Sequence, residues 1–98
     1  MSGLGGLFDG ELEKRLVWLK AREIPGYDAW EWRRDAHGQV IRFSEHGNRN
    51  SEFGWEMDHY PTPKSLGGSD DVSNLRPLNC ASNAFHGGVL GALLNRRR

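Results

Sequence analysis

The chain has 98 residues, 37% of them hydrophobic, which is enough for one domain with a modest core and too little for two. Its 13 basic and 13 acidic side chains cancel, so a nucleic acid partner would have to be met by a local patch. The single Cys80 excludes an internal disulfide and a cysteine-only zinc site, which suits a reducing compartment. Because no apolar run could span a membrane and no secretory signal is visible, we expect a cytoplasmic location.

The first predicted element is a helix. Residues 1–8 are rich in glycine and are expected to fray, whereas Asp9 is suited to cap a helix from about Gly10 to Arg22. Apolar side chains recur at helical spacing along it, so we expect this helix to cover a sheet. The stripe consists of Leu12, Leu16 and Leu19, widened by Val17 and Trp18.

Two short strands are expected next, over Trp30–Asp35 and Gln39–Phe43, joined as a hairpin by residues 36–38. Large aromatic side chains alternate along these strands and the next one, as buried strand positions do. We therefore expect four of them in the core and not on a base-stacking surface: Trp30, Trp32, Phe43 and Trp55.

The second half has the order strand, long loop, strand, helix. Phe53–Tyr60 alternates as a strand, and a polar loop of roughly 14 residues follows, which is long enough to suggest a function. Leu75–Leu78 is the second strand. From Asn79 a helix is expected to carry Asn83 and His86 until Gly87 and Gly88 interrupt it.

Four positions within this order form a motif. Asp58 and His59 end the first strand, Asn74 follows a loop that contains Gly67–Gly68, and Asn83 lies in the helix. An Asp–His pair alone would more often be an ordinary strand end, but four positions in register are hard to obtain by chance. Over about residues 53–87 the chain resembles the HNH endonuclease family and its ββα-metal finger.

The resemblance implies an α+β fold of one domain, residues 1–98. Residues 9–52 would form a supporting N-terminal helix and an additional short β-hairpin, residues 53–87 the ββα-metal finger, and residues 88–98 a C-terminal tail. Many relatives hold a structural zinc with two pairs of cysteines. No structural zinc is expected in this chain, because it has only Cys80.

The resemblance also implies phosphodiester hydrolysis. His59 would be the catalytic base, since an imidazole titrates near neutral pH. Asp58 and Asn83 would bind one divalent ion, Mg²⁺ or Mn²⁺, because carboxylate and amide oxygens are hard ligands. Asn74 would assist catalysis by tying the loop so that His59 is oriented, and would not bind the metal.

The implied partner is DNA. One base and one metal would nick a single strand, so a cut through both strands would need a homodimer or a second encounter. A partner protein could supply specificity. His86 and Arg76 are possible phosphate or metal contacts. Several arginines are candidates for phosphate contacts, although surface solvation is the commoner explanation for any one of them, and the closing run is the best candidate: Arg33, Arg34, Arg42, Arg49, Arg76 and Arg96–Arg98.

Two alternatives stay open. A non-catalytic DNA-binding or assembly module could retain the HNH scaffold, which the neutral net charge and the Gly87–Gly88 break would suit. An RNase or a broadly non-specific nuclease is also possible, since such a finger would contact the nucleic acid backbone and not the bases.

Overall fold

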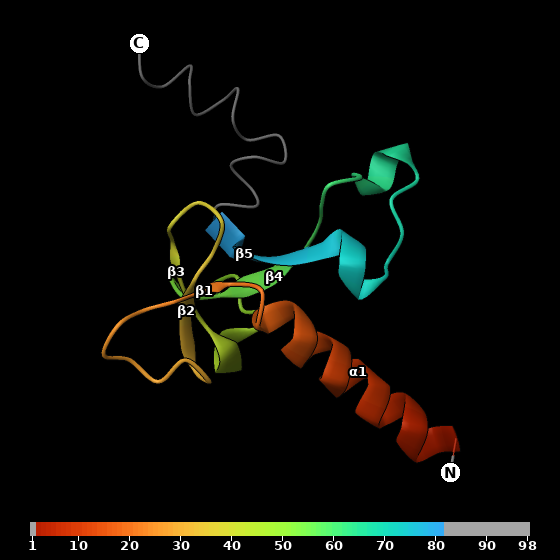
Figure 1. Cartoon of the computed structure of the whole chain (residues 1–98), viewed down its shortest axis with the longest axis horizontal. Coiled ribbons are helices and arrows are strands. Elements are labelled where there is room, and N and C mark those ends of the chain that lie inside the picture. Colours follow the sequence, from red (N-terminus) through yellow and green to blue (C-terminus); the bar gives the residue numbers. More distant parts are fainter. Residues whose placement is uncertain (1, 82–98) are drawn as a thin grey trace.

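The computed structural model describes residues 2–81, with side chains from Gly10 onward. The described chain is α+β, with one helix and two antiparallel sheets (Figure 1). None of the helices in this part of the chain is long and apolar enough to cross a membrane. The helix and strands are α1 (Ser2–Trp18), β1 (Arg22–Glu23), β2 (Trp32–Arg34), β3 (Val40–Arg42), β4 (Trp55–His59) and β5 (Leu75–Asn79).

The helix α1 differs from the expected one at both ends. It begins at Ser2, so Asp9 lies inside it and is not its N-cap. Glycines disfavour a helix by about 1 kcal/mol each, which is why the sequence predicted a later start. After Trp18 the helix gives way to shorter-range bonds, from the backbone N–H of Lys20 to the Val17 carbonyl and of Ala21 to the Trp18 carbonyl.

A third strand follows the helix where the sequence predicted only a hairpin. Arg22 and Glu23 pair antiparallel with Arg34 and Arg33, so the sheet has the order β1-β2-β3. The expected helical end at Arg22 is therefore wrong, because tertiary pairing outweighs helix propensity at this position.

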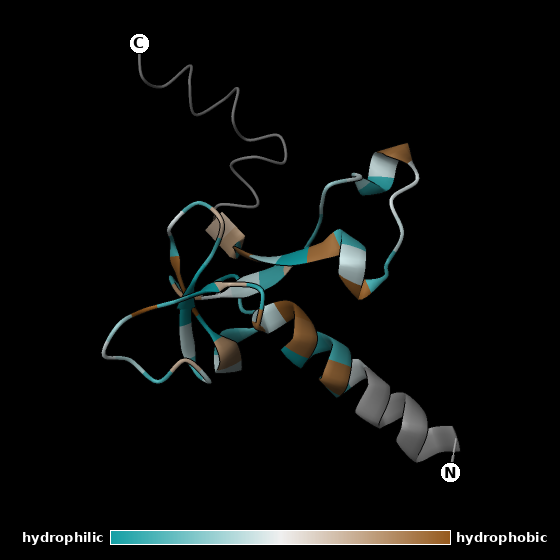
Figure 2. Ribbon diagram, in the orientation of Figure 1, coloured by the Kyte–Doolittle hydropathy of each residue, from teal (hydrophilic) through white to brown (hydrophobic). Residues whose placement is uncertain are grey.

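Fewer residues of the predicted apolar stripe are buried than the sequence led us to expect. Val17 and Trp18 are fully buried and Ala21 nearly so. Leu12, Leu16 and Leu19, by contrast, are 57%, 42% and 42% exposed. Figure 2 shows apolar segments at several points around the described part of α1, so hydropathy alone does not mark its buried side.

The core forms where the end of α1 meets both sheets. Trp18 packs against Phe43 and Trp55, with ring centroids 5.4 Å and 5.2 Å apart. Trp55 and Ile41 are fully buried, whereas Phe43 and Trp32 are only partly buried. The expectation for Trp30 is wrong, since it is 57% exposed. Its ring is covered instead by the guanidinium of Arg15, 3.6 Å from the ring centroid.

Two buried polar side chains join the sheets. The Asp35 carboxylate accepts backbone N–H groups of His37 and Gln39 in the β2–β3 turn and of Asn79 at the end of β5. The Asn79 amide donates to two carbonyls in the preceding segments, those of Val40 and Glu52. Its oxygen accepts the N–H of Ala81, where the backbone turns helical directly after β5.

Candidate active site

The β4–β5 ribbon presents the Asp–His pair at one end. Its register places Asp58 opposite Arg76 and His59 opposite Leu75. Residues 60–74 form the loop that links the two strands, and Figure 1 shows this loop projecting from the ribbon beyond His59. Two short 3₁₀ turns, Lys64–Leu66 and Val72–Asn74, give the loop a defined path.

The imidazole of His59 is held by the loop. Its Nε2 lies 2.7 Å from Oδ1 of Asp70, and Lys64 Nζ lies 3.0 Å and 3.3 Å from the two Asp70 oxygens. Hydrogen bonds from His59 first, and then from Lys64, lower the pKa of the Asp70 carboxyl, which is therefore ionised at neutral pH. A carboxylate only accepts hydrogen bonds, so in the neutral imidazole the proton sits on Nε2 and Nδ1 is the acceptor.

The Asp58 carboxylate has a different partner. Arg76 donates from Nε to Oδ2 of Asp58 over 2.9 Å, and both side chains are about three-quarters buried, with exposed fractions of 24% and 23%. The Arg76 guanidinium also covers the ring of Tyr60, 3.9 Å from its centroid. Successive strand side chains point to opposite faces, which is why the neighbours Asp58 and His59 contact different elements.

Asn74 ties the two ends of the loop together. Its buried side chain accepts the Thr62 N–H at 2.9 Å and donates to the carbonyls of Thr62 at 2.9 Å and Ser69 at 3.0 Å. Its own carbonyl accepts the N–H of Tyr60. The amide thus fixes the segment after His59 and the segment before Asp70 against each other.

The two glycines of the motif have separate roles in this loop. A Cβ at Gly68 would lie 1.9 Å from the Thr62 carbonyl oxygen and 2.8 Å from Nδ2 of Asn74. No larger residue therefore fits without moving the hydrogen bonds between Asn74 and Thr62. Gly67 has open space around it but a φ of +86°, which L side chains rarely adopt. Both glycines are therefore required by the conformation of the loop, Gly68 by close contacts and Gly67 by its positive φ.

Sequence reasoning gave two loop-fixing residues no role. Asp70 lies in the loop between His59 and Asn74, and no residue spacing marked it as a partner of His59. Lys20, just past the end of α1, donates to the carbonyls of Val72 and Leu75 and so anchors the far end of the loop. No local pattern marks Lys20, because its partners are more than fifty residues away along the chain.

Of the expected metal ligands, Asp58 lies within the described residues. Asn83 and His86, like Arg96–Arg98, lie outside the described residues. Within residues 2–81 no three His, Cys, Asp or Glu side chains gather into a group that could hold an ion. Asp58 fits the proposed use: it is a hard oxygen ligand at a strand end, and the described contacts engage only its Oδ2.

The candidate phosphate contacts divide into paired and unpaired arginines. Arg33 is buried, and its guanidinium donates to the carbonyls of Ala21 and Ala29, so the expectation that it contacts phosphate is wrong. Other arginines form ion pairs, namely Arg42 with Glu31, Arg49 with Glu56 and Arg76 with Asp58. Arg34 is exposed, and its described hydrogen bond goes to the carbonyl of Gly38.

No protein-family model, curated protein or solved structure matches this chain. The functional interpretation therefore rests on the residues of the site.

Proposed function

We propose that this chain is a metal-dependent DNA endonuclease of the HNH type, with His59 as the general base. The observation that carries the proposal is the His59–Asp70 contact. It presents an imidazole with Nδ1 as its acceptor nitrogen at the end of β4, next to a carboxylate in the sequence. The strand–loop–strand order, with helical backbone starting at Cys80, is the order that the resemblance implies.

The residues divide the work as follows. His59 Nδ1 takes the proton from the water that attacks the phosphorus atom, while Asp70 holds the ring and its tautomer. Asn74 keeps the loop folded so that Asp70 stays beside His59. A divalent ion, held by Asp58 and Asn83, would supply charge neutralisation at the phosphate and at the leaving oxygen.

A single base serves one scissile bond at a time. A monomer therefore nicks duplex DNA, and a cut through both strands needs a homodimer, a partner protein or a second encounter. The preferred ion is Mg²⁺ or Mn²⁺, since the proposed donors are oxygens.

The direct test is nicking of supercoiled plasmid by the His59→Ala variant, with Mg²⁺, Mn²⁺ and EDTA lanes. Loss of a general base should slow nicking by about 100-fold or more. His46→Gln is the control, because His46 packs against Trp55 at the opposite end of β4. Thermal melting should show both variants folded. Wild-type nicking by a folded His59→Ala protein would remove His59 from the mechanism.

A second candidate function is a non-catalytic DNA-binding or assembly module. The observation that favours it is that Asp58 and His59 are each already paired, with different residues. Arg76 neutralises Asp58 on one face of β4, while His59 contacts Asp70. DNA affinity without any metal-dependent cleavage would support this module.

RNA digested beside DNA in the same assay separates a DNase from a broadly non-specific nuclease.

A further inference from the structure

The three-stranded sheet has an outer face with an unusual set of side chains. In β2 and β3 the alternate residues Arg33 and Ile41 point into the core. The remaining residues share the opposite face, and register pairs Arg22 with Arg34, Arg34 with Val40 and Trp32 with Arg42. We define the outer sheet face as Arg22, Trp32, Arg34, Val40 and Arg42.

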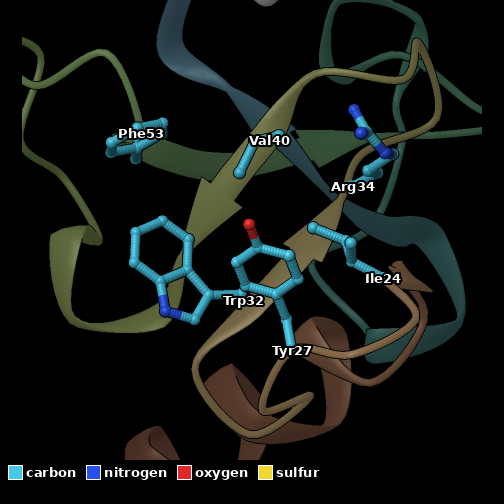
Figure 3. A pocket seen from close by; sticks show the side chains of 6 residues that line it. All are labelled: Ile24, Tyr27, Trp32, Arg34, Val40 and Phe53. Carbon is cyan, nitrogen blue, oxygen red and sulfur yellow. The ribbon is translucent and has the colours of Figure 1, made fainter.

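An aromatic pocket lies on this face. It has a volume of about 290 Å³, at the lower end of the range for small-ligand pockets. The Trp32 ring makes edge contacts with Phe53, at 5.1 Å between centroids, and with Tyr27, at 6.5 Å. Figure 3 shows the Trp32 and Tyr27 rings side by side, with Ile24 and Val40 next to them and Arg34 at one edge.

Two arginines at this face have no carboxylate partner among the residues that the structure describes. Arg22 and Arg34 are directly opposite in the sheet, and like charges in that position destabilise it. Within residues 2–81 neither makes an ion pair, although Glu52 lines an adjoining recess with Arg34. Both guanidiniums approach the turn at Gly38: Arg34 donates to its carbonyl, and Arg22 Nη2 lies 4.0 Å from where a Cβ would stand. A bound anion would relieve this repulsion.

We propose that the outer sheet face binds an unpaired nucleotide segment of a DNA strand. One base enters the pocket of Tyr27, Trp32 and Phe53, and the flanking phosphates lie on Arg22 and Arg34. Aromatic rings beside a basic track are what single-stranded nucleic acid requires. Bases within a duplex are stacked and paired, so they cannot enter such a pocket without being extruded. The choice of DNA rests on the proposed function; the site itself is separate from His59.

The two arginines of this face form a local basic patch in a chain with equal numbers of acidic and basic residues. The chain has no net charge, so any polyanion must be met locally. Arg33, Arg42, Arg49 and Arg76 form ion pairs within the described residues, and Arg15 donates to the Trp30 carbonyl and covers two aromatic rings. Arg22 and Arg34 form no ion pair in this part of the chain and stand opposite each other in the sheet. Arg34 lines the pocket, and Arg22 lies opposite Arg34 in the sheet.

The test is fluorescence anisotropy with a labelled oligo(dT) strand and a blunt duplex of equal length, in EDTA so that no cleavage occurs. The wild type should bind the single strand more tightly. Tyr27→Ala and Trp32→Ala should each weaken that binding by about ten-fold. Tyr27 is 62% exposed, so its removal tests the pocket even if Trp32→Ala fails to fold.

The arginines have their own readout. Arg22→Ala with Arg34→Ala should lower the slope of log affinity against log salt by about 1.4, or about 0.7 per phosphate contact. Arg49→Ala and Leu66→Ala are matched controls, because both side chains are about 75% exposed and neither lines the pocket or belongs to the outer sheet face. Equal binding of duplex and single strand, or unchanged binding in the Tyr27 and arginine variants, would overturn the inference. So would preferential binding of an acidic, Tyr-containing peptide over the oligonucleotide.

The outcome is independent of catalysis. Single-strand binding that depends on the outer sheet face, in a protein that never cleaves DNA, would leave this inference standing without the nuclease. Cleavage lost in His59→Ala but binding unaffected by the face variants would do the reverse.

Discussion

His59 and Asp70 are joined by a contact of 2.7 Å between Nε2 and Oδ1, across a loop that must fold to bring them together. The imidazole is 23% exposed and the carboxylate 72% exposed, so a partly buried base is held from the solvent side. The ring orientation therefore depends on the loop, and the loop depends on Asn74 and Gly68.

Asp70→Ala should slow plasmid nicking by about ten-fold or more, because the ring of His59 loses the partner that fixes its orientation and tautomer. Asp70→Asn keeps an acceptor oxygen and should be intermediate. The ¹⁵N shifts of the His59 ring should report a single Nε2–H tautomer in the wild type and a mixture in Asp70→Ala. Asp71→Asn, the neighbouring carboxylate, serves as the control. A wild-type nicking rate and an unchanged ring spectrum in Asp70→Ala would contradict the role of Asp70.

The same contact sets a pH dependence at the acid end. Hydrogen bonds from His59 and Lys64 lower the pKa of Asp70 in the folded protein below its ordinary value of 3.8. A depressed carboxyl pKa stabilises the fold above pH 3.8, and this contribution is lost as the pH falls through the lowered value. The ¹³C signal of the Asp70 carboxyl should titrate below 3.8, and Lys64→Ala should move the midpoint up. A midpoint at or above 3.8 in the wild type would contradict the contact.

The sequence predicted the β4–β5 half of the fold well. Alternation, turn residues and the polar loop located both strands within about two residues, because each signal is local. The first half was harder to predict. The end of α1 and the strand β1 depend on pairing of Arg22 and Glu23 with β2, and no periodicity reports such a pairing.

The aromatic residues illustrate the same limit. Strand alternation assigns Trp32 to one face of β2, but it does not say which face the core covers. The core covers the face that carries Arg33, whose guanidinium donates to the carbonyls of Ala21 and Ala29, and Trp32 is left lining an open pocket. A buried arginine directly after a partly exposed tryptophan is not a pattern that propensity predicts.

At the site, the motif identified Asp58, His59 and Asn74 but not their partners. Asp70, Arg76 and Lys20 act through side-chain reach across a folded loop. Such contacts depend on rotamers and on loop path, which residue spacing does not encode.

Asn74→Ala should destabilise the fold by about 2 kcal/mol, because it leaves the Thr62 N–H and two carbonyls without their partner. Denaturant unfolding measures the change. Asn74→Asp is the sharper comparison, since it keeps the acceptor for Thr62 but loses both donated bonds. Amide exchange at Thr62 should speed up in Asn74→Ala and much less in Asn74→Asp. Slow exchange at Thr62 in both variants would show that Asn74 does not hold the loop.

The two motif glycines should respond differently to substitution. Gly68→Ala places a methyl group 1.9 Å from the Thr62 carbonyl oxygen, so it should break the hydrogen bonds between Asn74 and Thr62 and reduce nicking strongly. Gly67→Asn keeps open space and the left-handed conformation that asparagine tolerates, so it should cost little. Melting temperature and nicking rate are compared for the pair. Equal tolerance at both positions would argue against the close approach at Gly68.

Arg76→Met tests whether Asp58 serves as a metal ligand. Arg76 competes with any cation for the Asp58 carboxylate, and a partly exposed ion pair is worth up to about 1 kcal/mol, or about five-fold in affinity. Arg76→Met should therefore tighten Mn²⁺ binding by a few-fold in a direct titration, and Asp58→Asn should weaken it. Arg49→Met removes a more exposed pair, with Glu56, and should leave Mn²⁺ binding unchanged. If the Mn²⁺ affinity is the same in Arg76→Met, Asp58→Asn and the wild type, Asp58 is excluded from the metal site. Both freeing and neutralising a true ligand would change the affinity.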